Sequence, residues 1–455
     1  MDVTQTLCVV RRPARSAIEN CNRHLDFTKR VWERLVKPII DKRPHIILPC
    51  LGTDGDVYPF LGLGRVLRER GFRATLASHE HFADRASQAN LEFRKLVSNE
   101  ETERLLRNPD FWHPLKGPAT VARWGAALLG AHYQDLTELV AEGNVVIVGS
   151  PGFLPGRLLN EMRGIPLISV ILQPWMLASS IRPPLMMGGL SLPRWAPRWM
   201  GDLYWHLAHR LGTKWLVPEL NPLRKSLGLQ PLKNMFQWWL SPQLIIGMFP
   251  EWYGPPQADW PQQLKLAGFP VDDVKTSPEL PADLIDFCEA DEPPIIFTFG
   301  TGMMHAEKLF ASAIEACRIL GRRGIFLTKF RAQLPETLGE DFRHVEFAPF
   351  QQIFPRSGVV VHHGGIGTTA KALAAGVPQL ILPFAFDQMD NAVRVKDLGA
   401  GDWLNRQDRS PVKLARVLKS LLAVESRTRA QSVVPRLARS RALERAADWI
   451  QEPGI

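Results

Sequence analysis

The sequence alternates short apolar runs with longer helix-like segments, and this alternation constrains the fold more than any other feature. Strands are predicted at His45–Cys50, Arg73–Ser78, Val145–Gly149, Leu167–Leu172, Ile295–Phe299, Ile325–Leu327, Val345–Phe347, Val359–His362 and Gln379–Pro383. Strands that alternate with helices indicate parallel sheets covered by helices on both faces. Ligands of such sheets bind at the carboxyl ends of the strands.

The chain length of 455 residues predicts two domains, because one ordinary core does not grow that large. We expect an N-terminal extension at 1–43, with one helix around Leu25–Ile40. Two α/β domains follow at 44–262 and 263–433, facing each other across a cleft. The last segment, 434–455, is expected to be a helix that could cross back to the first domain.

Composition favours a cytoplasmic globular protein. Apolar residues make up 45% of the chain and charged residues 22%. The longest apolar stretch, Pro166–Ile181, is broken by Gln173 and Pro174, so no transmembrane helix is expected. Leu7–Val10 is too short for a secretory signal. The five cysteines follow no metal or disulfide spacing and are expected to be reduced: Cys8, Cys21, Cys50, Cys288 and Cys317.

The net charge of +9 is concentrated near the C-terminus, where 406–448 hold eleven Lys/Arg against four Asp/Glu. Such a segment could attract nucleic acid or the anionic inner face of a membrane. A solvated helical face is the simpler interpretation, and no nucleic-acid-binding motif accompanies the segment. We therefore expect no nucleic-acid partner and leave peripheral membrane contact open. The oligomeric state is not predicted.

The segment His362–Thr369, with sequence HHGGIGTT, is typical of a diphosphate site. A β-branched strand ends in two histidines, glycines follow, and a helix then begins. Glycines let the backbone approach a ligand, and the free N–H groups of a helix N-terminus bind phosphate. The alternative is a tight strand–helix turn with a threonine N-cap.

The same residues could instead form the dinucleotide-binding site of an oxidoreductase. Gly365, Gly367 and Ala370 fit the G-x-G-x-x-A fingerprint, and Asp387 follows near the place of a ribose-binding carboxylate. An NAD(P)-dependent oxidoreductase is therefore an alternative, although the paired histidines and the late position are unexpected for it.

Two further groups carry candidate chemistry. Asp387 and Gln388 follow a strand and can both accept from and donate to sugar hydroxyls. Asp56 lies in a Gly-rich turn after the first strand, where a carboxylate could take a proton from an attacking hydroxyl. In each case a helix N-cap is the structural alternative.

The region 175–239 holds seven of the fourteen tryptophans. It could be ordinary core, an apolar acceptor pocket or a membrane-interface patch. Trp175 here, and Trp112 earlier in the chain, are candidate acceptor contacts.

Together these segments resemble the GT-B glycosyltransferases of family 1, with a family 28-like N-terminal pattern. The stretch 361–391, VHHGGIGTTAKALAAGVPQLILPFAFDQMDN, resembles the donor signature of bacterial and sterol-type enzymes. The first strand–helix turn of these enzymes is similar to residues 52–71 of this chain, GTDGDVYPFLGLGRVLRERG. Three further segments are similar to segments of the rhamnosyltransferases that build rhamnolipids: NPDFWHP near Phe111, FPEWYGPPQADWP near Trp252, and GFP at Gly268–Pro270.

The resemblance implies an inverting, metal-independent transferase that uses a UDP- or dTDP-sugar, of the UDP-glucose or dTDP-rhamnose type, and an apolar or lipid-like acceptor. No other cofactor is implied. Asp56 would be the base, and Asp387 and Gln388 would hold the sugar. Phe347 and Phe350 would flank the nucleobase. The diphosphate would contact Thr301, Gly302, His362, Gly364, Gly365, Gly367, Thr368 and Thr369.

The chain departs from the family pattern at one position that bears on the donor. Plant members carry a ribose-binding Glu after the diphosphate segment, where this chain has Ala370-Lys371. The absence of this Glu is compatible with a dTDP-sugar as the donor. It does not distinguish a dTDP-sugar from a UDP-sugar, because sterol-type UDP-glucose enzymes also lack that Glu. A non-catalytic nucleotide-sugar or lipid-binding module is the remaining alternative.

Overall fold

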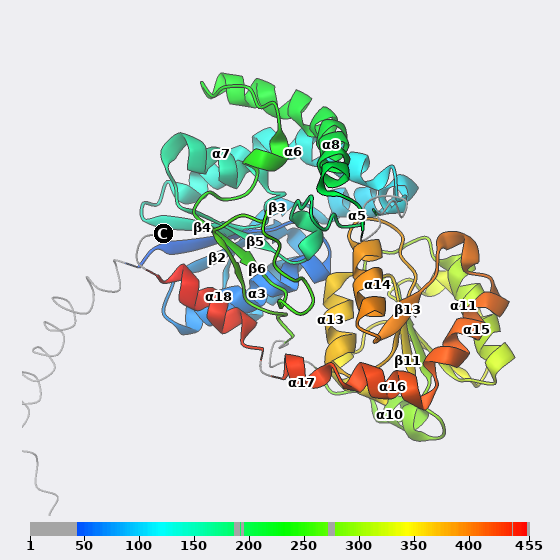
Figure 1. The fold of residues 1–455 in the computed structure, drawn as a ribbon. Helices are drawn as coiled ribbons and strands as arrows, with labels where there is room; N and C mark the ends of the chain where they lie inside the picture. The colour runs from blue at the N-terminus through cyan, green and yellow to red at the C-terminus, as the bar shows by residue number, and fades with distance from the viewer. Residues whose placement is uncertain (1–42, 186–191, 193–194, 272–277, 439, 453–455) are drawn as a thin grey trace, which may run out of the picture.

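The structure is a computed structural model that describes residues 43–185, 192, 195–271, 278–438 and 440–452 (Figure 1). The helix expected around Leu25–Ile40 lies outside these residues. The described part forms two α/β domains, each built on one parallel sheet.

The first sheet has seven parallel strands in the order β3-β2-β1-β4-β5-β6-β7. The strands are β1 (His45–Pro49), β2 (Ala74–His79), β3 (Glu92–Val97), β4 (Val145–Gly149), β5 (Leu167–Ile171), β6 (Leu244–Gly247) and β7 (Leu264–Leu266). β1, β4 and β5 are buried along their whole length, as expected for strands covered by helices on both faces. The helices of this domain are α3 (Asp54–Glu69), α4 (Ala83–Gln88), α5 (Asn99–Arg107), α6 (Gly117–Val140), α7 (Leu154–Arg163), α8 (Arg198–Ser226) and α9 (Met235–Trp238).

The second sheet has six parallel strands in the order β10-β9-β8-β11-β12-β13. The strands are β8 (Ile295–Thr298), β9 (Gly324–Leu327), β10 (Phe342–Val345), β11 (Val359–His362), β12 (Gln379–Ile381) and β13 (Gly401–Trp403). The helices are α10 (Ala282–Glu289), α11 (Glu307–Leu320), α12 (Phe350–Ile353), α13 (Ile366–Ala374), α14 (Gln388–Asp397), α15 (Pro411–Leu421) and α16 (Val424–Gln431). Both sheets therefore confirm the predicted doubly wound parallel architecture.

Two local differences from the sequence expectations follow from strand pairing. β7 pairs with β6, so the first sheet extends to Leu266, past the expected boundary at residue 262. β10 pairs with β9 through Phe342–Val345, which places the strand earlier than the expected Val345–Phe347. Phe347 consequently lies in the loop after the strand rather than within it.

The end of the chain returns to the first domain. After α17 (Val434–Leu437), α18 (Ala442–Ile450) lies beside α3, as Figure 1 shows by the red helix next to the blue one. Leu443 packs so closely on Gly62 that a Cβ there would lie 2.8 Å from its side chain. Arg70 and Asp448 add an ion pair at 2.7 Å on the rim of this contact. α18 is thus part of the first domain's packing, although it follows the second domain in sequence.

Candidate active site

A cavity of about 1430 Å³ lies where the carboxyl ends of the two sheets face each other. The first domain lines it with the loops after β1 and β5 and with parts of α6 and α8. The second domain lines it with the loops after β8, β11 and β12. The cavity is therefore at the place where parallel sheets bind ligands.

The turn between β11 and α13 presents a helix N-terminus to this cavity. Gly365 is the N-cap, and Ile366, Gly367 and Thr368 form the first helical residues and line the cavity. The first N–H groups of a helix have no intrahelical partner and carry the positive end of its dipole. Gly364 makes the turn possible, because its φ is +93° and a Cβ would lie 2.7 Å from Ile381. This local geometry suits an anion such as a diphosphate.

His362 does not line the cavity, so the structure places its side chain away from the predicted diphosphate position. As the last residue of β11 it is wholly buried, and its Nδ1 accepts the Gly364 N–H at 3.1 Å. Its Nε2 lies 2.9 Å from the Gln379 side-chain oxygen and donates to it, since Nδ1 is already an acceptor. Burial lowers the pKa of His362 to about 3, so the ring is neutral. His362 supports the turn from beneath.

His363 is the histidine that lines the cavity. Its side chain hydrogen-bonds the backbone of Thr298, and its Nδ1 is buried without a hydrogen-bond partner. Burial lowers its pKa to about 4. His363 was not among the site residues predicted from the sequence. The signal was available, because the side chain that follows the end of a parallel strand is the one that reaches the ligand edge.

The remaining predicted diphosphate residues divide between contact and support. Thr301 and Gly302, in the loop after β8, line the cavity beside Gly365 and Thr368. Thr369 is wholly buried and its hydroxyl donates to the Gly365 carbonyl at 3.0 Å. The Thr369 hydroxyl is therefore used inside α13, and the predicted contact of Thr369 with the diphosphate stays a prediction for its backbone.

Asp387 and Gln388 both line the cavity at the start of α14, but their roles differ. The Gln388 side-chain oxygen accepts the N–H groups of Phe384 and Ala385 at 2.7 and 3.1 Å. That oxygen shapes the loop, which leaves the amide nitrogen as the group for a ligand. Asp387 accepts a hydrogen bond, at 2.6 Å, from the side chain of Asn391. Burial, and then the negative charge of Asp56, raise the pKa of Asp387 to about 7.

Asn391 is a second residue that sequence reasoning missed. It is wholly buried, and its amide nitrogen also donates to the Gly364 carbonyl at 2.8 Å. Its oxygen accepts from the Tyr253 hydroxyl at 2.8 Å. One side chain thus couples the position of Asp387 to the position of the anion-binding turn.

Asp56 stands at the first turn of α3 and faces the cavity. Its Oδ2 accepts the Thr53 N–H at 2.8 Å and the Thr53 hydroxyl at 3.1 Å, which makes a capping box. Burial raises the pKa of Asp56 despite these hydrogen bonds. The N-cap alternative for Asp56 is wrong, because Thr53 is the N-cap and Asp56 is the third residue of α3. Asp56 stabilises the helix start as the capping-box partner of Thr53 and also presents a carboxylate to the cavity.

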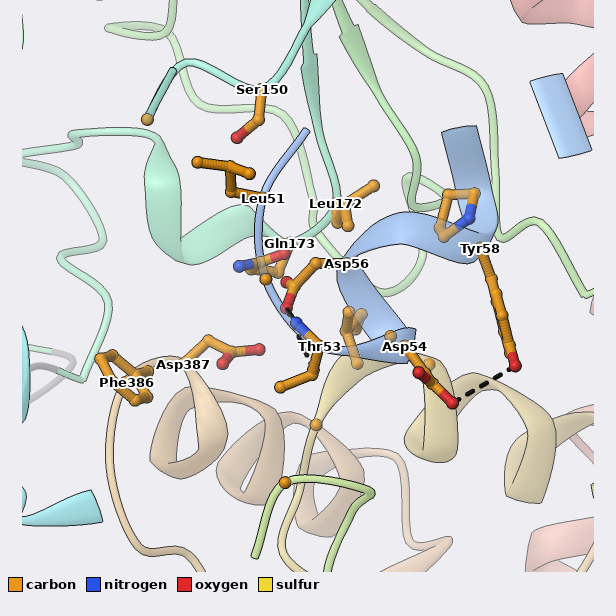
Figure 2. Close-up of a pocket in the computed structure, with 18 of the residues that line it drawn as sticks. Leu51, Thr53, Asp54, Asp56, Tyr58, Ser150, Leu172, Gln173, Phe386 and Asp387 are labelled. Carbon is orange, nitrogen blue, oxygen red and sulfur yellow. Dashed lines mark hydrogen bonds between the residues drawn. The ribbon is translucent and has the colours of Figure 1, made fainter. Parts of the chain in front are cut away.

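Figure 2 shows Asp56 and Asp387 approaching the same part of the cavity from different domains. Asp56 comes from the β1–α3 turn and Asp387 from the loop before α14. Their mutual charge repulsion contributes to the raised pKa of Asp387. A proton acceptor and a sugar-binding carboxylate could therefore act on one substrate held between the domains.

Phe347 and Phe350 line the cavity on the side of the second domain. Phe347 is 54% exposed, and the Phe350 ring stacks on Phe354 with centroids 4.3 Å apart. The Lys371 ammonium lies 5.8 Å from the Phe350 centroid. The exposed Phe347 ring, and the Phe350 ring with Lys371 above it, suit the base and ribose of a nucleotide.

The first domain makes its part of the cavity apolar. Trp112 and Trp175 line it as predicted, and each has an indole N–H that is buried without a hydrogen-bond partner. Trp205, Trp215 and Trp239 line it as well. Part of the tryptophan-rich region therefore forms the wall of a ligand cavity.

Comparison with known proteins identifies the two halves. Residues 46–180 match the glycosyltransferase family 28 N-terminal domain, and residues 325–442 match the erythromycin biosynthesis protein CIII-like C-terminal domain. The chain is 30% identical over 437 residues to an O-mycaminosyltylonolide 6-deoxyallosyltransferase of Streptomyces fradiae, covering 90% of this chain and 97% of that one. It is 26% identical to a Candida albicans sterol 3-beta-glucosyltransferase over 78% of this chain, but spans only 24% of that protein.

Solved structures agree on the fold. The calicheamicin glycosyltransferase CalG4 superposes with a TM-score of 0.66 at 20% identity, over 90% of this chain and 98% of that one. A spinosyn rhamnosyltransferase solved with thymidine diphosphate gives 0.61 at 17% identity, over 90% of this chain and all of that one. None of these comparisons supports the oxidoreductase alternative. The chain is a glycosyltransferase of the GT-B fold and belongs to the family that joins a family 28-type N-terminal domain to an EryCIII-like C-terminal domain.

Proposed function

We propose that this enzyme transfers a hexose or deoxyhexose, with inversion, from a UDP- or dTDP-sugar to a hydroxyl of an apolar or lipid-like acceptor. The observation that carries the proposal is the meeting of three groups in one cavity. Asp56 comes from the first domain, while Asp387 and the N-terminus of α13 come from the second. Relatives named for macrolide and sterol glycosylation support an apolar acceptor.

In the proposed reaction the acceptor oxygen attacks the anomeric carbon in a single displacement. The Asp56 carboxylate takes the hydroxyl proton, and the bond between the anomeric carbon and the diphosphate oxygen breaks. The neutral His363 ring already donates to the Thr298 backbone, so it packs beside Gly365 and does not donate to the phosphates. The N–H groups of α13 stabilise the charge that develops on the diphosphate. We propose that these donors act without a metal ion, as the family resemblance implies.

Asp387 and the Gln388 amide would hold the sugar hydroxyls, with one acceptor and one donor. Thr301 and Gly302 would contact the phosphates, and Phe347 with Phe350 would flank the base. Trp112 and Trp175 would contact the acceptor. Thymidine diphosphate in solved neighbours favours testing dTDP-sugars beside UDP-sugars. Peripheral contact with a membrane belongs to the proposal, because acceptors of the lipid class reside there.

The test combines nucleotide binding with product analysis. Wild-type protein is expected to gain thermal stability with UDP or dTDP and not with NAD, and product mass with a panel of sugar donors and lipid-like alcohols would show the transfer. Asp56→Asn is expected to lower transfer by about 10²- to 10⁴-fold while nucleotide affinity stays within about twofold. Transfer by Asp56→Asn at the wild-type rate would exclude Asp56 as the base. Absence of nucleotide binding would exclude the donor site.

A further inference from the structure

Helix α8 has two faces with different surroundings. Its inner face lines the acceptor side of the cavity through Trp205, Ala208, Gly212, Trp215 and Leu216. Its outer face is exposed to solvent on the far side of the same helix. Figure 1 shows α8 along the upper edge of the first domain. One helix therefore separates the acceptor cavity from the surface.

The outer face carries a row of exposed apolar side chains. Trp199, Leu203, Leu207 and Leu211 recur at four-residue intervals and are 63%, 50%, 53% and 50% exposed. From Trp199 to Leu211 the row is about 18 Å long. Trp195, which is 79% exposed, precedes the helix. A continuous row of this kind is unlike the singly scattered apolar residues of an ordinary surface.

A row of charged residues runs beside the apolar row at the same spacing. Arg198, Asp202, His206, Arg210 and Lys214 are all exposed. Three are cationic at neutral pH and one is anionic, so the row carries an excess of positive charge. Tryptophan and leucine beside Lys and Arg are the pattern of helices that lie in the plane of an anionic membrane surface.

Contacts on the inner face of α8 fix the rotation of the helix about its axis, and this keeps the apolar row on the outside. A Cβ on Gly201 would lie 2.1 Å from the Ser180 carbonyl oxygen, which shows how closely the helix packs there. The Trp205 indole N–H donates to the Ser179 carbonyl at 2.8 Å. Rotating the apolar row inward would break both contacts.

We propose that the outer face of α8 docks on an anionic lipid bilayer. The apolar row would insert at the level of the headgroups, while the cationic side chains of the charged row contact the lipid phosphates. Docking would bring the tryptophan-lined cavity next to the bilayer, and this last step rests on the proposed lipid-like acceptor. It assigns membrane contact to α8 rather than to the basic segment 406–448. In that segment Arg409 and Arg427 are directed inward, to the Pro383 and Ser357 carbonyls.

Co-sedimentation of the full chain with vesicles tests the proposal. Vesicles of phosphatidylcholine with about one quarter phosphatidylglycerol are compared with pure phosphatidylcholine, at low and high salt. The double variant Leu203→Gln/Leu207→Gln is expected to lower partition into the anionic vesicles at least about tenfold. The matched control is Val412→Gln/Val424→Gln, because these valines are 70% and 76% exposed and lie on α15 and α16. The control is expected to bind as wild type does.

Three results would overturn the proposal. Wild-type protein could fail to bind anionic vesicles, the control could lose as much binding as the α8 variant, or the protein could form a concentration-dependent dimer that the α8 variant abolishes. The last result would assign the face to a second copy of the chain. UDP and dTDP affinity, measured on the same samples, separates these outcomes from a failure of the proposed function. Unchanged unfolding temperature shows that the variants are folded.

Discussion

Replacing Asp387 by asparagine should stabilise the fold at high pH while it weakens the binding of the sugar donor. The pKa of Asp387 is raised from 3.8 to about 7, chiefly by burial and next by the charge of Asp56. The folded protein therefore holds this proton to higher pH than the unfolded chain does. Ionisation of Asp387 consequently lowers the free energy of unfolding, and this cost is complete above pH 7.

The size of the effect follows from the shift. One pKa unit corresponds to about 1.4 kcal/mol, so a shift of about three units gives at most about 4 kcal/mol above pH 7. The cost falls below half of that by pH 5 and vanishes below the unfolded pKa. Water in an open cleft screens part of the charge, so about 2 kcal/mol is a reasonable expectation at pH 8. Asparagine has the same shape and can still accept the hydrogen bond from Asn391.

The assay is denaturant unfolding of wild type and Asp387→Asn at pH 5 and pH 8. The variant should gain more stability at pH 8 than at pH 5. Its affinity for the nucleotide-sugar should fall, whereas its affinity for UDP or dTDP alone should not. An equal gain at both pH values, or a loss at pH 8, would show that the carboxylate is not destabilised by its surroundings.

Three further outcomes are expected. His363→Ala should weaken UDP or dTDP binding at least about tenfold, because its ring packs against Gly300 and Gly365 at the wall of the cavity. His362→Ala should instead lower the free energy of unfolding by about 2 kcal/mol or more. Calorimetry measures the first effect and denaturant unfolding measures the second. Gly52→Ala should nearly abolish transfer, because its φ is +141° and a Cβ would lie 2.4 Å from the Asp56 Oδ2. Gly143→Ala is the control in the same rate assay, because Gly143 also has a positive φ, +111°, but has open space and is not a lining residue of the cavity. Transfer should decline as pH falls through the raised pKa of Asp56, since the base must be ionised; a rate profile that is flat down to pH 4 would contradict this.

The sequence was sufficient wherever the signal was local. The β1–α3 and β11–α13 turns each combine a buried strand, glycines and a helix start within a few residues, and the sequence located both. The start of α3 was not predicted correctly, because the helix begins at Asp54 and therefore includes Asp56, which was expected in the turn. The two sheets followed from the alternation of strands and helices. These features depend on neighbours in the chain, which periodicity and turn chemistry report directly.

The sequence was insufficient where the role of a side chain depends on the residue at which a strand ends, or on a contact between residues far apart in the sequence. Whether His362 or His363 reaches the ligand depends on the residue at which β11 ends. The second use of Asn391 depends on Gly364 and Tyr253, which lie far away in the sequence. The tryptophan-rich region could be recognised as apolar from the sequence. Which tryptophans line the cavity, as Trp205 does, and which are exposed, as Trp199 is, depends on how α8 packs.

The return of α18 to α3 has a mechanical consequence. Within the described residues, α17 packs on α13 of the second domain, and α18 packs on α3 of the first. Only a few residues separate α17 from α18 in the sequence. A displacement of the second domain should therefore pull on the helix that packs against α3, and so on the helix that carries Asp56.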